Sequence, residues 1–405
     1  MTRVAVIADS QFDGESRFDE AVRLHDWIAQ DLAGRGVDLI LHAGDVFERR
    51  STPEEREAVA EWVTRCAELA PVVVVRGNHD EEGELAILRR LRTRNPVVVE
   101  EAAGVHMAAG VAVACLAWPR RAELLARLRD AGAASAREAT EQAAAGALRT
   151  VLLGLGEQLA RHGGPRVLLA HAMVRGSRVS TGQPLVGCDF ELGLEDLALA
   201  GADFVALGHV HRAQDWTWNG VPIVYPGSAR RRDFGEVEEK SYVLLEVNQE
   251  VCGCSYGWKR GACSMCGNRG AVDWTRIPIP ARSLLLLHDE WASGEWLCGL
   301  TGMGSEADAA GAEVRLRYQV AADQRDAARL AAADAATRLL ALGAVSVKLE
   351  EQVRPVARAR APEVAAAPTL NGKVVAYWAA KGTMPSAERR ASLLAKLHEV
   401  EAEVA

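Results

Sequence analysis

Five short apolar runs within the first 210 residues each lead into an acid, an amide or a histidine. They are VAVIAD, VDLILHAGD, PVVVVRGNHD, RVLLAH and ADFVALGH, which end at Asp9, Asp45, Asp80, His171 and His209. Such runs, bounded by polar loops, are typical of strands that are buried on both faces, and the stretches that follow the first three have helical character. Buried strands that alternate with helices predict a layered α/β core. In cores of this kind the loops at the carboxyl ends of the strands carry the chemistry.

The rest of the chain predicts further regions. VPIVYPGSA and SYVLLEV are expected as additional strands of the same body. From Ala312 to Val320 apolar and charged residues alternate, an Ala-rich helix follows to about Leu342, and VSVKLEEQV alternates again, which predicts a small β-α-β unit. We therefore expect a core at 1–280 with a cysteine-rich insertion at 249–270, a small α+β domain at 281–352, an extended linker at 353–368 and a helix-loop-helix at 369–405.

Length, composition and charge exclude several classes of protein. A chain of 405 residues exceeds what one hydrophobic core usually supports, so we expect two or three domains. No apolar run approaches the ~20 residues that span a bilayer, and the amino terminus does not resemble a secretory signal, so we expect a cytoplasmic protein with no membrane role. The net charge of −8 means that contact with DNA must come from a local basic patch. Arg230, Arg231 and Arg232 are candidates, and solvated surface is the alternative.

The polar residues that follow the apolar runs have the chemistry of a two-metal centre. They are Asp9, Asp45, Asn78, His79, Asp80, His171, His209 and His211. Two divalent cations roughly 3.5–4 Å apart need a bridging carboxylate and nitrogen and oxygen ligands on each side, which this set supplies. Taken singly, each motif is more often a turn or a core residue. Five motifs in one order, all at the ends of apolar runs, are hard to obtain by chance.

This order resembles the calcineurin-like metallophosphoesterases, whose signature is D-x-H, GDxx(D), GNH(D/E), H and GHxH. The resemblance covers roughly residues 3 to 247 and implies an α/β fold, a four-layer sandwich. It implies a first metal held by Asp9, Gln11, Asp45 and His211, and a second held by Asp45, Asn78, His171 and His209. It also implies that His79 is the general acid and that Asp80 orients its ring.

The chain departs from this signature at two places. Gln11 stands where the family has histidine, and its neutral amide oxygen is a weaker ligand for the later transition metals. Direct ligation by Gln11 and contact through a metal-bound water are both open. Glu48 stands where relatives carry Asp or His, and the sequence assigns it no firm role.

The carboxyl-terminal half is similar to the SbcD-type nuclease family. YPGSARRRDFGEVEEKSYVLLEV matches a segment of that family, the β-α-β unit resembles its capping domain, and RAPEVAAAPTL resembles the link that follows. The resemblance implies cleavage of DNA at or near ends with two Mn²⁺ or Mg²⁺, as exonuclease and endonuclease. It also implies a homodimer and an SbcC-type coiled-coil ATPase partner. The alternatives are a catalytically weakened DNA- or ATPase-binding module, a phosphoesterase for another phosphodiester, and a generic oligomerisation appendage.

Four cysteines lie close together in the insertion: Cys252, Cys254, Cys263 and Cys266. Four thiolates spaced as C-x-C and C-x-x-C and separated by glycines suit a tetrahedral structural Zn²⁺. Unligated thiols are the alternative.

The tail presents two apolar stripes at helical spacing. One consists of Leu370, Val374 and Trp378, and the other of Leu393, Leu397, Val400 and Val404. So short a hairpin cannot bury both stripes internally, so another surface must cover them. The SbcD resemblance implies that this surface is the base of the ATPase's coiled coil, and the alternatives are the capping domain or a second copy of the chain.

Overall fold

The computed structural model describes residues 1–119, 137–183, 191–247, 258–259, 262–263, 272–298, 301–302, 306–354 and 361–404. The chain divides into two compact units. One comprises Met1–Leu287, Thr301–Arg315 and Thr337–Lys348, and the other His288–Leu300, Leu316–Ala336 and Leu349–Ala405. Within the described ranges, no helix has both the length and the apolar character to cross a membrane.

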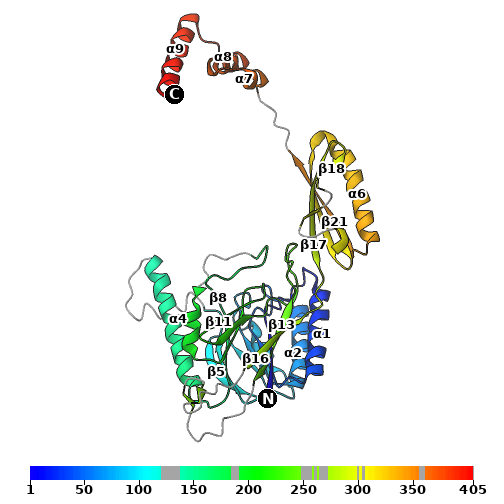
Figure 1. Ribbon diagram of the computed structural model, residues 1–405, viewed down its shortest axis with the longest axis vertical. Helices are drawn as coiled ribbons and strands as arrows, with labels where there is room; N and C mark the ends of the chain where they lie inside the picture. Colours follow the sequence, from blue (N-terminus) through cyan, green and yellow to red (C-terminus); the bar gives the residue numbers. More distant parts are fainter. Residues whose placement is uncertain are drawn as a thin grey trace. The chain divides into compact units, whose positions relative to one another are not determined.

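Two six-stranded sheets form the body of the first unit (Figure 1). The first sheet has the order β16-β13-β1-β2-β3-β4, with bounds Val272–Pro278, Ser241–Val247, Thr2–Ile7, Leu39–His42, Val72–Val75 and Val97–Glu100. The second has the order β11-β12-β10-β7-β6-β5, with bounds Gln214–Trp218, Val221–Tyr225, Phe204–Gly208, Arg166–His171, Val111–Leu116 and Ala103–Ala108. Strands β1 to β4 are parallel, as are β12, β10, β7 and β6, and antiparallel strands close the edges.

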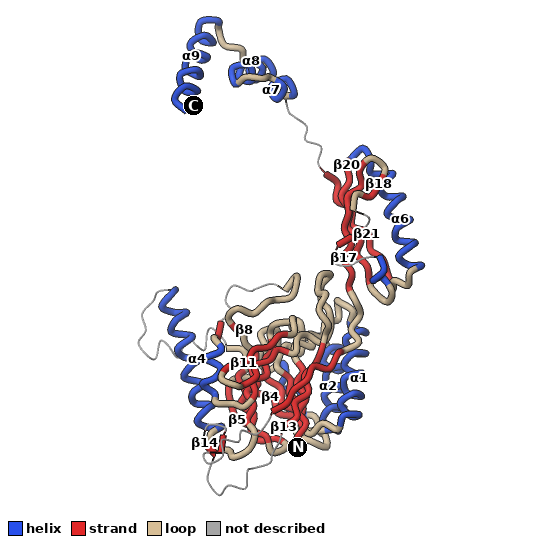
Figure 2. The backbone as a smooth tube through the Cα atoms, viewed as in Figure 1, coloured by secondary structure: helices blue, strands red, loops and turns tan. Residues whose placement is uncertain are grey.

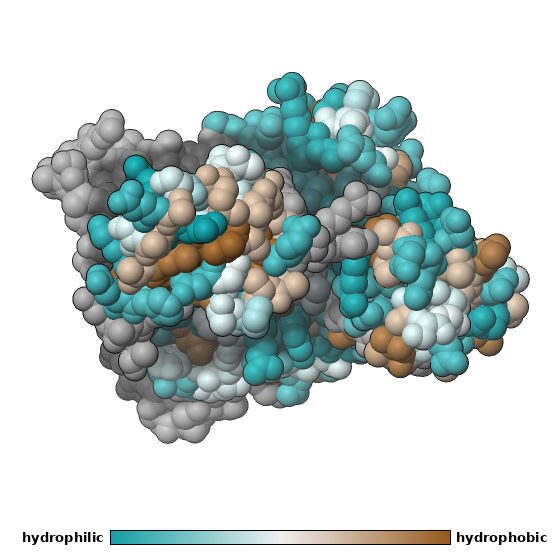
Figure 3. Space-filling view, turned by 90° about the horizontal axis from the view of Figure 1, so that it is seen from above, coloured by the Kyte–Doolittle hydropathy of each residue, from teal (hydrophilic) through white to brown (hydrophobic). Residues whose placement is uncertain are grey.

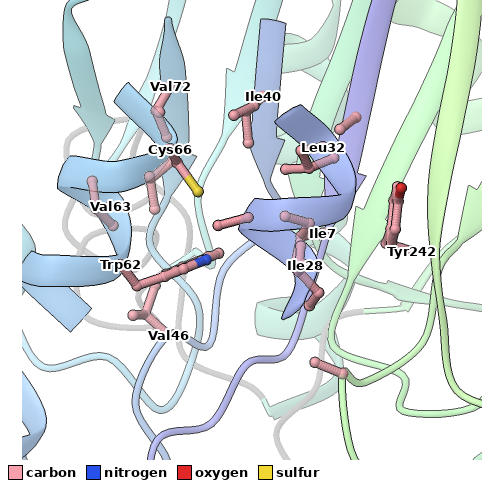
Figure 4. Packing of buried hydrophobic residues seen from close by; sticks show 14 of the residues in the cluster. Ile7, Ile28, Leu32, Ile40, Val46, Trp62, Val63, Cys66, Val72 and Tyr242 are labelled. Carbon is pink, nitrogen blue, oxygen red and sulfur yellow. The ribbon is translucent and has the colours of Figure 1, made fainter. Parts of the chain in front are cut away.

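Helices cover the outer faces of both sheets, as Figure 2 shows. Helices α1 (Phe18–Arg35) and α2 (Pro53–Leu69) pack on the first sheet, where Ile28, Trp62 and Cys66 meet Ile7 and Ile40 (Figure 4). Helix α4 (Arg137–Leu159) packs on the second sheet. The result is the four-layer α/β sandwich that the sequence predicts, and that prediction is confirmed.

Strand β1 shows why these runs are apolar throughout. Ala5 and Ile7 point into the core beneath α1 and α2, whereas Val4 and Val6 point into the core between the two sheets. Because successive side chains of a strand face opposite sides, a strand that is covered on both faces needs apolar residues at every position. The first polar side chain therefore comes where the strand leaves the sandwich.

Shorter elements connect the body. They are β8 (Met173–Val174) paired with β9 (Glu191–Leu192), α5 (Leu194–Leu197), two 3₁₀ turns at Glu84–Arg90 and Ala198–Ala200, and the two-residue strands β14 (Trp258–Lys259) and β15 (Ala262–Cys263).

A third sheet follows the body in sequence, with the order β18-β17-β20-β21 and β19 beside β17. Its bounds are Leu284–Ala292 for β17, Glu295–Trp296 for β18, Thr301–Gly302 for β19, Glu313–Ala321 for β20 and Ser346–Arg354 for β21, with 3₁₀ turns at Glu306–Ala309 and Ala322–Gln324. Helix α6 (Arg325–Ala341) connects β20 to β21 and buries the stripe Ala328, Ala332, Ala335 and Leu339. This is the small α+β region expected from the sequence. The chain ends in α7 (Pro362–Ala366), α8 (Leu370–Lys381) and α9 (Ala387–Val404).

Candidate metal centre

Three buried side chains at the ends of parallel strands bring their ligand atoms within 4.8 Å of one another: Asp45, His171 and His209. Asn78 joins them, because its Oδ1 lies 2.9 Å from Nε2 of His171 and 2.8 Å from Nδ1 of His209. Nδ1 of His171 lies 2.7 Å from the carbonyl oxygen of Ala43, to which it can donate, so Nε2 faces the cluster as the ligand atom. The structure thus brings together the four residues that the family resemblance assigns to the second metal.

The loops that carry the candidate ligands have unusual backbones. Asp9, Gln11 and Asp45 have φ angles of 50°, 45° and 53°, and His209 has a φ of 109°. Positive φ is uncommon outside glycine, and residues in such conformations concentrate at functional sites. Gly77 permits the loops to approach closely, because a Cβ there would lie 2.0 Å from Oδ1 of Asp45. These loops are therefore shaped to hold the ligands, since no strand or helix geometry would place them so.

The residues expected around the first metal lie on the other side of Asp45. Gln11 and Asp9 are fully buried, and the backbone N–H of Gln11 donates to the carbonyl oxygen of Asp45 over 3.0 Å. Nε2 of Gln11 lies 2.9 Å from Nε2 of His211. Oδ1 of Asp9 accepts from the backbone N–H of His209 over 2.9 Å. Oδ2 of Asp9 and Oε1 of Gln11 are both buried without a hydrogen-bond partner among the described residues.

These observations test whether divalent cations fit. At the second position a carboxylate, an amide oxygen and two imidazole nitrogens converge, a mixed oxygen and nitrogen donor set that suits a divalent metal ion. At the first position, two buried oxygens without a partner require a cation or water, because buried polar atoms are almost always satisfied. The residues present therefore fit a metal centre.

Burial and mutual charge shift the pKa values in the centre. Burial alone would raise the pKa of Asp45, but the charge of His171 and the hydrogen bonds from His171 and His79 hold it well below its usual range. Burial would lower the pKa of His171, but Asp45 and then Asp9 raise it to about 9. Burial raises the pKa of Asp9 to about 7, although His171 opposes the rise. The paired charges of this cluster are the kind that a bound cation compensates.

His79 stands at the rim of the centre with 31% of its side chain exposed. Its Nε2 lies 4.0 Å from Oδ2 of Asp45, and its Nδ1 can donate to the backbone carbonyl of Glu48. Burial lowers the pKa of His79, but the nearby carboxylates of Asp45 and Glu48 outweigh burial and raise it. Arg232 in turn pairs with Glu48 over 2.8 Å. Glu48, which has no firm role by sequence, is thus the residue that holds the ring.

The carboxylate of Asp80 accepts from backbone N–H groups and does not contact the ring of His79 in the way that the resemblance implies. Its Oδ1 accepts from the backbone N–H of Phe47 over 3.0 Å, and its Oδ2 accepts from the backbone N–H of Gly77 over 2.8 Å. Both carboxylate oxygens therefore tie the loops after β2 and β3 together. The expectation that Asp80 orients the ring of His79 is wrong, because Glu48 supplies the ring's hydrogen-bond partner.

Arg230 is a structural residue, which corrects the expectation that it contacts DNA, whereas for the half-buried Arg231 and Arg232 that expectation stays a prediction. Arg230 is fully buried and donates to the carbonyl oxygens of Ser16 and Gln11 over 2.9 Å each. Arg231 donates to the carbonyl oxygens of Glu236 and Ala281, and other carbonyls nearby. A guanidinium group that is fully buried and bonded to the backbone, as that of Arg230 is, cannot reach a phosphate. Arg232, which is 17% exposed, is engaged by Glu48 and Asp13.

Trp118 and Gln183 contact the centre but did not emerge from the sequence. Trp118 lies two residues after β6, and its ring stacks on that of His209 with centroids 4.7 Å apart. Gln183 donates to the carbonyl oxygen of His209 over 2.6 Å and accepts from the backbone N–H of His211 over 3.1 Å, which clamps the loop between the two histidines. The sequence does contain a pattern that could have indicated Trp118, because this residue ends an apolar run, as the candidate ligands do.

A buried chain of hydrogen bonds supports the loop after β1. The backbone N–H of Gly44 donates to Nδ1 of His42 over 3.3 Å, so His42 donates from Nε2 to Oγ of Ser10 over 2.8 Å. Ser10 then donates to Nε2 of His25 over 2.7 Å, and Nδ1 of His25 donates to the carbonyl of Ala21 over 2.7 Å. The N–H of Gly44 at one end and the carbonyl of Ala21 at the other fix the direction of each hydrogen bond between them. His42 and His25 are therefore both neutral. The chain connects α1 to the loops of Asp9 and Asp45.

The predicted zinc site lies largely outside the described residues, which include neither Cys252, Cys254 nor Cys266. Cys263 is in β15, which pairs with β14 in register Trp258 with Cys263 and Lys259 with Ala262. The zinc assignment stays a prediction.

The fold and the centre agree with the comparison with known families. A profile of the calcineurin-like phosphoesterase superfamily domain matches residues 2–250, so the chain belongs to this superfamily. It is a metallophosphoesterase in its fold and in its cluster of possible metal ligands.

Two curated relatives come from Bacillus subtilis (strain 168). The chain is 34% identical to the uncharacterized metallophosphoesterase YhaO over 82 residues, which is 20% of this chain and 19% of YhaO. It is 26% identical to the SbcD subunit of the nuclease SbcCD over 261 residues, which is 58% of this chain and 62% of that relative. The chain thus spans less than two thirds of the length of either relative.

Solved structures with similar folds include a dimetal phosphatase from Danio rerio and a purple acid phosphatase from yellow lupin. The first is 12% identical with a TM-score of 0.40 and covers 60% of this chain and 92% of its own. The second is 16% identical with a TM-score of 0.36 and covers 60% of this chain and 49% of its own.

Proposed function

We propose that the chain is a two-metal phosphodiesterase that cleaves DNA, as the nuclease subunit of an SbcCD-type complex. The observation that carries the proposal is the convergence of Asp45, Asn78, His171 and His209 at the ends of parallel strands. The choice of DNA is supported by similarity to the SbcD subunit of the nuclease SbcCD over 58% of the chain. A small α+β region and a helical tail after the sandwich also support it.

The proposed centre would hold two Mn²⁺ or Mg²⁺, with Asp9, Gln11, Asp45 and His211 around the first and Asp45, Asn78, His171 and His209 around the second. Bound there, the cations supply the Lewis acidity that polarises a phosphodiester and lowers the pKa of water.

His79 is proposed to donate the proton to the leaving oxygen. Its place at the rim leaves it accessible to a substrate, and the carboxylates of Asp45 and Glu48 raise the pKa of its ring, which favours the protonated form that an acid needs. Glu48 directs the ring, because its carbonyl oxygen holds Nδ1 and so leaves Nε2 to face the centre. The ionised carboxylate of Asp45 and the neutral amide oxygen of Asn78 present only acceptor atoms to the centre, so the proton comes from His79.

The test is cleavage of linear duplex and single-stranded DNA by the purified chain with added Mn²⁺. Asp45→Asn, purified in the same way, removes a central carboxylate with almost no change in volume and controls for contaminating nuclease. We expect cleavage that requires Mn²⁺ and falls to background in Asp45→Asn. Equal rates for the wild type and the variant would contradict the assignment of the site.

A phosphodiesterase for a substrate other than DNA is the second candidate. The observation that favours it is the burial of Arg230 and the bonding of the half-buried Arg231 to backbone carbonyls, which weakens the case for a basic patch that binds DNA. Hydrolysis of bis(p-nitrophenyl) phosphate without cleavage of either form of DNA would select this candidate. Absence of both activities in a chain that binds Mn²⁺ would favour the binding module with weakened catalysis.

The remaining parts of the proposal concern partners. We propose a cytoplasmic homodimer in which the helices of 369–405 dock on the coiled coil of an SbcC-type ATPase, 281–352 acts as the capping domain and 353–368 is the linker. The similarity to the SbcD subunit of the nuclease SbcCD supports this arrangement. We also propose that 249–270 binds one structural Zn²⁺ through its four cysteines.

A further inference from the structure

Strand β21 lies at an edge of the third sheet. Its neighbour on one side is β20, and within the described ranges no strand pairs with its other side. An edge strand of nine residues leaves a row of backbone N–H and C=O groups that a further strand can bind. Three apolar side chains just before this strand and along it are exposed: Val345, Leu349 and Val353. The edge therefore offers backbone groups and apolar surface together.

The ion pairs of β21 identify which of its side chains share a face. Glu351 pairs with Arg329 of α6 over 2.7 Å, so the odd-numbered side chains of the strand lie on the face that α6 covers. Because successive side chains of a strand point to opposite faces, the even-numbered ones lie on the other face. Leu349 therefore shares the α6 face with Glu351, and Lys348 shares the other face with Glu350.

An antiparallel second copy of β21 is complementary to this edge when Leu349 of one protomer lies opposite Leu349 of the other. Lys348 of each protomer then lies opposite Glu350 of the other, so two pairs of opposite charge form on one face. On the α6 face, the two Leu349 side chains meet, and Val353 of each protomer lies opposite Val345 of the other. The apolar side chains that are exposed at the edge thus cover one another.

The neighbouring registers are unfavourable. A pairing centred on Lys348 places two lysines opposite each other, and one centred on Glu350 places two glutamates opposite each other. Like charges that lie directly opposite destabilise a pair of strands. The registers between these turn one sheet over, so that Leu349 lies opposite Lys348 or Glu350 and not opposite an apolar side chain. The sequence of β21 therefore favours a single register.

We propose that β21 is an interaction surface for a second copy of the chain, and that the third sheet continues from one protomer into the other with Lys348 opposite Glu350. Backbone hydrogen bonds between the two strands supply affinity, and the side-chain pairs supply the register. The pairing assigns a surface to the homodimer proposed above and rests on that part of the proposal. It involves neither the metal centre nor DNA.

The test is the mass of the full chain in solution, measured by light scattering over a range of protein concentrations. Lys348→Glu or Glu350→Lys places like charges opposite each other at both pairs. Each variant should weaken association by at least ~10-fold, and should halve the mass of the assembly at concentrations where the wild type is just associated. The double variant Lys348→Glu/Glu350→Lys exchanges the two charges, so it should recover the wild-type mass.

The control is Gln352→Glu, which adds a charge at an exposed position on the same face of β21, opposite Ser346 in this register, and should keep the wild-type mass. Circular dichroism of each variant checks folding. Hydrogen exchange of the wild type should show that the amides of 346–354 are better protected at high protein concentration than at low.

A wild type that is monomeric at every concentration would overturn the proposal, as would an unchanged mass in both single variants or a double variant that does not recover. A monomeric wild type whose β21 amides become protected only when the cognate ATPase is added would assign the edge to the ATPase. If DNA cleavage is absent while the double variant recovers the mass, the proposed nuclease function fails and this inference stands. Cleavage by a chain whose mass none of these variants changes would leave the nuclease and remove β21 as the interface.

Discussion

The ring of His79 is held at the rim of the centre by a residue outside the candidate ligand set. The ring is bound by the carbonyl of Glu48, and the backbone N–H of His79 donates to Oδ1 of Asp45 over 2.9 Å. Removal of the ring should therefore leave the ligands in place. A variant without the ring therefore tests proton donation separately from metal binding.

We predict that His79→Ala slows DNA cleavage by ~10²–10⁴-fold, the usual contribution of a general acid. Hydrolysis of bis(p-nitrophenyl) phosphate should fall much less, because p-nitrophenolate leaves without a proton. Bound Mn²⁺, measured by elemental analysis, should equal that of the wild type. A parallel loss of metal would show that His79 is a ligand, and an equal loss on both substrates would show that it is not the acid.

His25 gives a second prediction at this scale, because its neutral form is part of the buried hydrogen-bond chain. Burial lowers its pKa to about 4; the bond to the Ala21 carbonyl opposes this and the charge of Arg230 adds to it. In the unfolded chain a histidine has a pKa of about 6.5. Between these values the unfolded state binds a proton that the folded state does not, so stability falls as the pH falls.

The expected size of this effect is roughly 2 kcal/mol from one histidine between pH 6.5 and 5, since one pKa unit corresponds to ~1.36 kcal/mol. His25→Gln should lower stability at pH 7 but flatten its dependence on pH. The measurement is urea unfolding followed by tryptophan fluorescence, to which Trp62 beside His25 contributes. His288→Gln, at an exposed histidine, should keep the wild-type slope. An unchanged slope in His25→Gln would exclude His25 as the cause.

The arginines show what the sequence does not reveal about single residues. Arg230 donates to carbonyl oxygens of Ser16 and Gln11, which precede it by more than two hundred residues. A local run of three arginines carries no information about such distant partners, so surface exposure was the natural expectation. The same holds for Glu48, whose role depends on His79 and Arg232 being brought to it by other strands.

At the scale of elements, the candidate ligands at the strand ends can be predicted from the sequence, but the side chains that hold the loops in place cannot. Asp9, Asp45, Asn78, His171 and His209 follow strands that must be apolar on both faces, so the first polar residue marks the edge of the sandwich. Gln183 lies in an irregular loop and acts through the backbone of His209 and His211. Any side chain with a donor and an acceptor could do this, so its identity carries no signal in the sequence.

The cysteine insertion supports a prediction about a single element. One equivalent of zinc should co-purify with the anaerobically prepared chain and be absent when Cys263 and Cys266 are both replaced by Ser, because tetrahedral sites need all four thiolates. Cys298→Ser, at an exposed free cysteine outside the insertion, is the matched control and should retain zinc. DNA cleavage by the double variant should persist if the insertion is a separate module. A wild type without zinc would remove the assignment.

For the whole molecule, the sequence predicts the secondary structure of each region more readily than the surfaces that the region contacts. Alternation of apolar residues with period two in β20 and β21, and an Ala-rich stretch between them, predicted the small α+β region in outline. The tail helices α8 and α9 also form where the apolar stripes predict them. What covers those stripes depends on other surfaces, so the sequence alone could supply it only through resemblance.

The tail leads to the last prediction. Asn371 and His398 join α8 to α9 over 2.7 Å, yet Leu370, Leu393 and Val400 remain 45%, 41% and 55% exposed. Figure 3 shows apolar side chains gathered in a strip between polar ones on the surface. Such a strip on a helical hairpin is suited to a groove of a partner, so we predict that deletion of everything after Ala367 abolishes co-purification with the cognate ATPase.

The truncated chain should keep the Mn²⁺-dependent nuclease activity and the dimer, measured by cleavage of linear DNA and by light scattering, because the candidate ligands all precede residue 212. Leu393→Glu tests the same surface in the full chain, since a buried carboxylate without a partner is costly in an apolar interface. Ala395→Glu, which introduces the same single negative charge at an exposed position of α9, should bind the ATPase as the wild type does. If the truncated chain retains the ATPase with undiminished affinity, the tail is not the docking element. If instead the dimer dissociates on truncation, the stripes cover one another between two copies of the chain.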